Sequence, residues 1–215
     1  MIKLLRKFSR VINFFPFNNK RKYFRGGVKI KYNNALLINC KIICKGKRNV
    51  IKFGMNSFFR NCVFYIYGDN NIVSIGQDSY AKNAEFYVED SNNSIMIGNK
   101  TSLCGKVHLA AIEGTKIEIG DECLFSSEIV FRTGDSHSLL NLNGDRINYS
   151  RDIVIGNKVW IGHRVLVNKG VSIPDNCMIG TGAVVTKKFE KQNVVIAGVP
   201  AKIVKEEVKW ISKRI

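Results

Sequence analysis

The sequence predicts an all-β fold, a parallel β-helix in which short strands wind around a triangular prism. Two observations predict it. An apolar residue followed by glycine recurs every 22 residues, at Gly54, Gly76, Gly98 and Gly120. From residue 155 the period shortens to six, in the hexads IGNKVW, IGHRVL, VNKGVS, IPDNCM, IGTGAV and VTKKFE. Repeats of this kind indicate a solenoid, because each one buries its apolar face only against its neighbours.

The repeats also predict the strands. Each 22-residue block between residues 51 and 138 opens with alternating apolar residues, as a short strand does, and most end in a turn rich in Gly, Asp and Asn. Three hexads make one 18-residue coil, with the first and fifth residues of each hexad pointing inward. Cys177 and Ala183 fall on such inward positions. We therefore expect 22-residue and then 18-residue coils over residues 31–200, and no helix within 50–200.

The two ends differ from the coils. Residues 1–30 form a basic segment, and residues 2–15 predict an amphipathic helix. Its apolar face consists of Ile2, Leu5, Phe8, Ile12 and Phe15. At the other end, within residues 201–215, the segment VKEEVKWISK (204–213) predicts a short helix that packs outside the coils and caps them.

The charge is concentrated at the N-terminus. The chain has 34 basic and 17 acidic residues, a formal charge of +17, and residues 1–60 hold 16 of the basic residues and no acidic one. Three interpretations stay open: the basic helix docks on the prism, it attaches to an anionic membrane surface, or the charge attracts an acidic glycan. A scaffold that binds nucleic acid would explain the charge but not the motifs below, so no nucleic-acid partner is expected.

The composition also predicts the cellular compartment of the protein. No run of 18 apolar residues exists, and residues 1–17 lack the uninterrupted apolar core of a signal peptide. The six cysteines show no C-x-x-C spacing. Free thiols in a reducing cytoplasm are therefore expected, with peripheral attachment to the inner membrane surface as the open alternative.

The repeat breaks once. The segment LLNLNGDRINYSR, within residues 138–151, fits no coil. A long excursion from a regular solenoid is more often functional than structural, so this excursion loop is a candidate part of a site.

Two segments resemble a known family. The hexads followed by AGVPAKIVK (197–205) look like the hexapeptide-repeat acyltransferases, and the run GDSHSLLNLNGDRINYSRDIVIGNKVWIGHRV (134–165) resembles their saccharide O-acetyltransferase branch, which includes galactoside and capsular or polysialic acid O-acetyltransferases. The resemblance covers about residues 50–205. It implies a left-handed β-helix, a homotrimer with sites between subunits, acetyl-CoA as co-substrate, no metal, and a saccharide hydroxyl as acceptor.

The resemblance also implies roles for single residues. His137, in the segment Asp135-Ser136-His137, matches the catalytic histidine, and Trp160 matches the tryptophan beside the thioester. The backbone amides of Gly162 and His163 are then candidate oxyanion donors. His108 stands where galactoside-type enzymes have an acceptor-binding asparagine, a departure from their pattern, and Asp135 is the other candidate acceptor contact. The group that orients His137 stays open between Asp135, Glu122 and a main-chain carbonyl.

The implied chemistry agrees with the residue types. Acetyl transfer to a hydroxyl needs a base, and a histidine with an ordinary pKa near 6.5 serves at neutral pH. His137 follows Asn71 and Asn93 by multiples of the 22-residue period, so it takes the same place in its block. This place predicts a turn residue that projects outward. The implied coenzyme A contacts are Trp160, Gly180, Ala183, Lys187, Lys188, Ala197, Gly198 and Lys202.

Two other enzyme classes were weighed. An N-acyltransferase acting on a nucleotide-linked amino sugar would use the same scaffold and coenzyme. A carbonic anhydrase would need three histidines converging on zinc. The sequence has only His108, His137 and His163, and no H-x-x-x-x-H pair, so the zinc enzyme is disfavoured.

Overall fold

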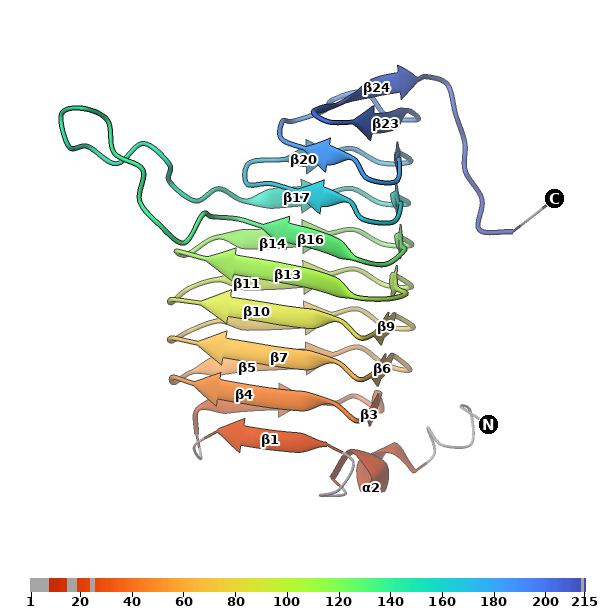
Figure 1. Cartoon of the computed structure of the whole chain (residues 1–215). Helices are drawn as coiled ribbons and strands as arrows, with labels where there is room; N and C mark the ends of the chain where they lie inside the picture. Colours follow the sequence, from red (N-terminus) through yellow and green to blue (C-terminus); the bar gives the residue numbers. More distant parts are fainter. Residues whose placement is uncertain (1–7, 15–18, 24–25, 214) are drawn as a thin grey trace.

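The computed structural model is a three-sided prism of stacked β-coils, and it describes residues 8–14, 19–23, 26–213 and 215. Most coils contribute one strand to each of three sheets, which run along the three sides of the prism and are parallel except at the last strand, β24 (Figure 1). The predicted all-β architecture is confirmed. No helix occurs between residues 50 and 200, as the repeat predicted.

In the described residues sheet A has eight strands, sheet B seven and sheet C nine. Sheet A consists of β1 (Lys20–Tyr23), β4 (Lys41–Lys45), β7 (Val63–Tyr67), β10 (Glu85–Glu89), β13 (Val107–Ile112), β16 (Ile129–Arg132), β19 (Leu166–Val167) and β22 (Val184–Val185). Sheet B consists of β2 (Val28–Lys31), β5 (Asn49–Phe53), β8 (Ile72–Ile75), β11 (Ser94–Ile97), β14 (Lys116–Ile119), β17 (Ile153–Ile155) and β20 (Ser172–Ile173). Sheet C consists of β3 (Leu36–Ile38), β6 (Phe58–Arg60), β9 (Tyr80–Lys82), β12 (Ser102–Leu103), β15 (Leu124–Phe125), β18 (Trp160–Ile161), β21 (Met178–Ile179), β23 (Val195–Gly198) and β24 (Ala201–Lys205).

The strand register reproduces the sequence period. Tyr80 pairs with Ser102 and Ser102 with Leu124, each 22 residues apart. Leu124 then pairs with Trp160, because the excursion loop lies within that coil, and Trp160 pairs with Met178, 18 residues on. The recurring glycines have a steric reason: a Cβ on Gly54 would lie 2.2 Å from the carbonyl carbon of Gly76 in the next coil.

The core is a continuous column of side chains inside the prism. Phe64 and Phe86 stack with ring centroids 4.5 Å apart, and both are fully buried. Toward the C-terminus the interior side chains are smaller, and Cys177 and Ala183 are buried there as predicted. The coils are thus held by apolar burial along the axis and by parallel hydrogen bonding between them.

The N-terminal boundary predicted at residue 31 is wrong. β1 and β2 already belong to the prism, because they pair in parallel with β4 and β5. Of the predicted helix over residues 2–15, the described part is α2 (Ser9–Phe14), and residues 1–7 and 15 lie outside the described residues. The buried side chain of Asn13 fixes α2 to the first coil by bonding Ala35 O and Leu37 N, each at 2.8 Å.

The predicted C-terminal helix is also wrong. Residues 201–205 form β24, which pairs antiparallel with β23, and residues 206–213 form no helix. Lys205 pairs with Val195 in sheet C, and the Val208 amide donates to the Asn193 carbonyl oxygen at 2.9 Å. Glu207, in the middle of the predicted helix, has a φ of +58°, which a right-handed helix does not accommodate.

No helix in the described part of the chain is both long enough and apolar enough to cross a bilayer.

Candidate active site

The excursion loop leaves the prism at the end of β16 and returns at β17 (Figure 1). A hydrogen bond from the Arg151 amide to the Thr133 carbonyl closes its neck at 2.8 Å. Near its tip Leu140 and Arg146 form an isolated antiparallel bridge. The excursion therefore begins about five residues before residue 138, the start that the sequence predicted.

Glu113 anchors the loop to the coil below. Its carboxylate lies 2.8 Å from the Arg146 guanidinium and accepts a 2.7 Å hydrogen bond from the Ser150 hydroxyl. These two partners, Ser150 first and then Arg146, hold the pKa of Glu113 below its ordinary value. The loop is thus tied to the prism by an ionised carboxylate.

His137 lies on this loop, and its backbone is fixed by a polar cluster. The Asn148 side-chain nitrogen donates to the His137 carbonyl oxygen and to Asp135 Oδ2, both at 2.8 Å. The Lys169 ammonium contacts the Asp135 carboxylate and donates to the Asn148 carbonyl at 2.9 Å. The contact with Lys169 is the main reason that the pKa of Asp135 is lowered, and Asn148 adds to it.

The imidazole of His137 is exposed and makes no hydrogen bond to the described residues. Of the three candidates to orient it, Asp135 is already engaged by Lys169. Glu122 lies at another corner of the prism, 3.9 Å from both Lys100 and Lys158. Within one chain neither carboxylate therefore orients the imidazole.

His137 is exposed at a bend, as predicted, but it does not share the position of Asn71 and Asn93. Those asparagines are buried and form a ladder, in which Asn71 Oδ1 accepts a hydrogen bond from the Asn93 amide at 2.9 Å. The ladder continues through Thr115 to Thr133, whose hydroxyls lie 2.7 Å apart. Because the chain leaves the prism after Thr133, His137 stands outside the coil and is exposed.

His108 lies on the outer face of sheet A, beside the foot of the excursion loop. It borders a cavity of about 220 Å³, whose other walls include Tyr87, Arg132 and Ser136. Its Nδ1 is 3.4 Å from Glu85 Oε1, while its Nε2 is buried without a hydrogen-bond partner. Burial lowers the pKa of His108, and the Glu85 carboxylate opposes that shift. Ser136, which borders this cavity, directly precedes His137 on the loop.

Trp160 lies on a different side of the prism, on the outer face of sheet C. It is half-buried, and its covering ring belongs to the same chain: Trp210 packs against it with ring centroids 6.1 Å apart. The Trp210 indole nitrogen donates to the Lys158 carbonyl oxygen at 2.7 Å. The C-terminal tail is thus fastened across sheet C.

The two backbone donors suggested beside Trp160 differ in the structure. The Gly162 amide already donates to the Ile179 carbonyl at 2.8 Å, so Gly162 is not a free oxyanion donor. The His163 imidazole has a structural contact, because its Nδ1 lies 2.9 Å from the hydroxyl oxygen and 3.0 Å from the carbonyl oxygen of Ser127. Within the part of the chain that the structure describes, the His163 amide has no hydrogen-bond acceptor.

Several suggested coenzyme contacts gather at the C-terminal end of sheet C. Gly180 lies close to Ala197, because a Cβ on Gly180 would be 2.8 Å from the Ala197 Cβ. Ala197 and Gly198 are in β23, and Lys202 pairs with Ala197 from β24. Ala183 does not belong with them, because its side chain is buried in the core. Lys187 and Lys188 are exposed and follow β22 on sheet A, so they lie apart from the sheet C group.

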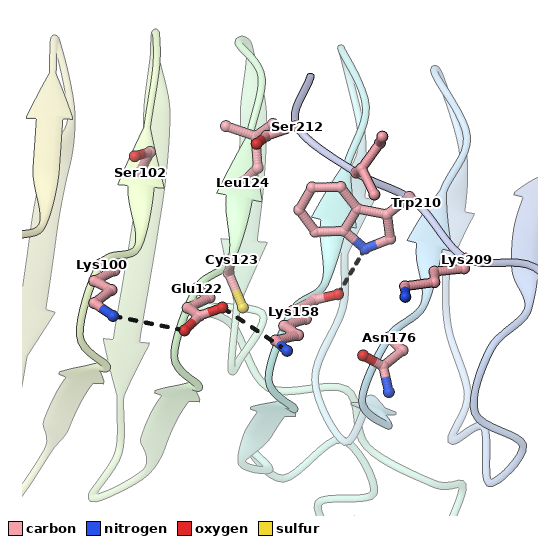
Figure 2. Close-up of a pocket in the computed structure, with 11 residues that line it drawn as sticks. Lys100, Ser102, Glu122, Cys123, Leu124, Lys158, Asn176, Lys209, Trp210 and Ser212 are labelled. Carbon is pink, nitrogen blue, oxygen red and sulfur yellow. Dashed lines mark hydrogen bonds and ion pairs between the residues drawn. The ribbon is translucent and has the colours of Figure 1, made fainter. Parts of the chain in front are cut away.

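A larger cavity lies between the tail and sheet C. It has a volume of about 580 Å³ and is bordered by Lys100, Glu122, Lys158, Lys209 and Trp210 among others. Figure 2 shows the Trp210 ring over this cavity and Glu122 between two lysines. The sequence reasoning missed this site, since it assigned Trp210 to a helix. It also missed Asn148 and Lys169, whose polar contacts across the loop carry no local sequence signal.

The candidate site residues therefore fall into two groups on different sides of the prism. His137 and His108 lie at the excursion loop, where the chain passes from sheet A to sheet B, and Trp160 lies on sheet C, the side opposite that corner. The three histidines occupy three different places. Among residues 8–14, 19–23, 26–213 and 215, no cluster of three His, Cys, Asp or Glu side chains could hold a metal ion.

Comparisons with known proteins identify relatives. A family model described as bacterial transferase hexapeptide (six repeats) matches residues 152–187. The galactoside O-acetyltransferase of Escherichia coli (strain K12) is 42% identical over 101 residues, which are 46% of this chain and 48% of that protein. The polysialic acid O-acetyltransferase of Neisseria meningitidis is 34% identical over 112 residues, 52% of each protein. The chain thus spans about half the length of the curated relatives that it matches.

A solved structure matches along nearly its whole length. The crystal structure of the polysialic acid O-acetyltransferase OatWY superimposes with a TM-score of 0.80, covers 92% of both chains and is 30% identical in sequence. The match includes the N-terminal coils as well as the hexad region. The chain belongs to the hexapeptide-repeat family of left-handed β-helix acyltransferases.

Proposed function

We propose that the chain is an acetyl-CoA-dependent O-acetyltransferase whose acceptor is a hydroxyl group of a cell-surface, capsular or lipopolysaccharide sugar. The observation that carries the proposal is the Asn148–Asp135–Lys169 cluster, which fixes the backbone of His137 on a loop whose Ser136 borders the His108 cavity. The names of the two O-acetyltransferase relatives support the reaction and the saccharide class of acceptor.

His137 acts as the general base in this proposal. Its imidazole takes the proton of the acceptor hydroxyl as that oxygen attacks the thioester carbonyl carbon. The same imidazole then returns the proton to the departing thiolate, so charge and protons balance. His108, Glu85 and Arg132 line the cavity beside it and supply hydrogen-bonding groups for sugar hydroxyls.

The sheet C half-site receives the acetyl donor. Trp160 offers an apolar wall for the thioester arm. The His163 amide is the proposed oxyanion donor. Lys202 is the proposed cation for the coenzyme phosphates at this half-site.

A complete site needs two copies of the chain, because the base and the donor half-site lie on different sides of one prism. We therefore propose a homotrimer with each site between neighbouring subunits. Sedimentation should give three times the chain mass of 24.3 kDa. A stable monomer at micromolar concentration would overturn this part.

Mixed assemblies test the shared site more sharply. His137→Ala and Trp160→Ala variants should each be nearly inactive alone. After co-expression, some neighbouring pairs would combine an intact His137 with an intact Trp160, and activity should return in part. A shared site is disproved if the mixture stays as inactive as its components.

The proposal places the reaction in the cytoplasm, where acetyl-CoA is available. The alternative, an N-acyltransferase for a nucleotide-linked amino sugar, is distinguished by its acceptor. Labelled acetyl-CoA should be incubated with neutral and acidic oligosaccharides and polysaccharides and with nucleotide-linked amino sugars, and products read by mass and by ester lability in mild base. Label in a base-labile saccharide ester is expected, whereas label only in a stable amide would overturn the O-acetyl proposal.

A further inference from the structure

The outer face of sheet A carries three tyrosine rings in mutual contact, one of which also borders the His108 cavity. Tyr87 on β10 is in register with Tyr65 on β7, and their ring centroids lie 6.4 Å apart. Tyr67 lies alongside, 6.2 Å from Tyr65 and 6.1 Å from Tyr87. All three rings are half-buried, so each keeps part of its surface open to a ligand.

Lysines extend this row toward the N-terminal coils. The Lys41 ammonium lies 5.6 Å from the Tyr65 ring centroid, and the Lys45 ammonium lies 5.4 Å from that of Tyr67. On the next strand Lys20 is in register with Lys41. Lys22 is also exposed there, two residues further along β1. We call these four lysines and three tyrosines the sheet A track.

The upper end of the track reaches the candidate active site. Ala110 on β13 is in register with Tyr87 below it and with Arg132 above it. The small Ala110 side chain leaves a gap in the row, and this gap is part of the 220 Å³ cavity beside Ser136 and the excursion loop. In Figure 1 the strands β1, β4, β7, β10 and β13 form one continuous ladder that leads up to the loop.

We propose that the acetyl acceptor is a carboxylated polysaccharide that lies along the sheet A track, with the sugar to be acetylated beside His137 and the rest of the polymer running toward Lys20. This rests on the proposed O-acetyltransferase function. Four strand spacings separate β13 from β1, which at about 4.8 Å each gives a track of about 19 Å, long enough for several sugar units.

The tyrosines, lysines and acids along the track each suit a different part of such a polymer. Aromatic rings bind the apolar C–H faces of sugars, and the lysines pair with carboxylates. Two acids lie near the upper end: Glu85 contacts His108, and Glu89 accepts a hydrogen bond from the Tyr87 hydroxyl at 3.1 Å. They suit sugar hydroxyls at the reacting unit, whereas the coils below present cations and, within residues 1–60, no acidic residue at all.

The test compares two lysine pairs that carry the same charge. Lys41→Ala/Lys45→Ala removes cations from the track, and Lys31→Ala/Lys52→Ala removes two exposed cations from sheet B. The probes are long-chain polysialic acid and its disaccharide. Loss of the track pair should raise the KM for the polymer about tenfold, leave kcat unchanged and leave the KM for the disaccharide unchanged. The sheet B pair should behave as wild type.

A titration of the same polymer without acetyl-CoA separates the track from the reaction. If the Lys41→Ala/Lys45→Ala variant binds the polymer about tenfold more weakly than wild type, the track is supported. If, in addition, the wild-type protein transfers acetyl to no saccharide, the proposed function is overturned while the track stands. If both double-lysine variants acetylate the polymer with the same KM, the track is overturned and the proposed function stands. Failure of the wild-type protein to bind the polymer would also overturn the track.

Discussion

Asn148 joins the two arms of the excursion loop by donating a hydrogen bond from its side-chain nitrogen to the backbone carbonyl oxygen of His137, 2.8 Å away. The same nitrogen lies 2.8 Å from Asp135 Oδ2. The candidate base is thus held through its main chain, while its imidazole stays free to meet an acceptor. A positioned base of this kind depends on the loop as much as on the histidine.

Asn148→Ala should therefore lower kcat without affecting the binding of acetyl-CoA. Small misplacements of a catalytic group cost about tenfold to a hundredfold in rate. The KM for acetyl-CoA should be unchanged, since the donor half-site lies on sheet C. Asn143→Ala, at the exposed loop tip, is the matched control and should keep wild-type kinetics. Equal kcat values for the two variants would show that Asn148 does not position the base.

The attachment of the loop should depend on acid pH. The pKa of Glu113 is lowered by Ser150 and Arg146, so its ionised form stabilises the folded loop. That stabilisation is complete above the ordinary glutamate pKa of about 4.3 and is lost as the pH falls through the lower folded-state value. Amide exchange in residues 138–151, corrected for its intrinsic pH dependence, should lose protection only in acid.

Glu113→Gln should reduce this protection already at neutral pH and remove most of its pH dependence. Residues 95–112, in the coil below, serve as the internal reference. Unchanged loop protection in the variant would show that Glu113 does not anchor the loop.

His108→Ala should act mainly on the acceptor. Its ring borders the 220 Å³ cavity beside the loop, and its Nε2 is left without a partner in the described structure. We expect the acceptor KM to rise about tenfold, as for the loss of one or two polar contacts, with a smaller change in kcat. His163→Ala is the comparison, because that imidazole contacts Ser127 and should matter little to acceptor affinity. A pure kcat effect of His108→Ala would contradict the assignment.

The sequence predicted the coil lengths because their signal is local and repeated. Gly54 and Gly76 mark the same close contact between coils, and Ile95 and Ile117 point into the same core. The position of His137 relative to the ladder of buried asparagines and threonines could not be predicted. The chain leaves the prism at Thr133, and the contacts that hold the loop there join residues far apart in the sequence. The placement of Trp210 could not be predicted either, since its partner, the Lys158 carbonyl, is 52 residues away.

The basic N-terminus should bind anionic membranes if attachment is its role. Replacing Lys3, Arg6 and Lys7 with alanine tests this and keeps Asn13, whose side chain bonds to the first coil. Wild-type protein should sediment with vesicles containing phosphatidylserine and be released by high salt, and the triple variant should sediment less. Equal sedimentation of the two proteins would leave these cations without a membrane role.

The central claim is that His137 is the general base for acetyl transfer to a saccharide, and His137→Ala tests it most directly. The measurement is the turnover of labelled acetyl-CoA with the best saccharide acceptor, beside acetyl-CoA affinity and Tm. Turnover should fall about 10²- to 10⁴-fold. Affinity and Tm should stay at wild-type values, because the side chain is exposed and fills no core space. A variant that retains near-normal turnover with that acceptor would contradict the claim.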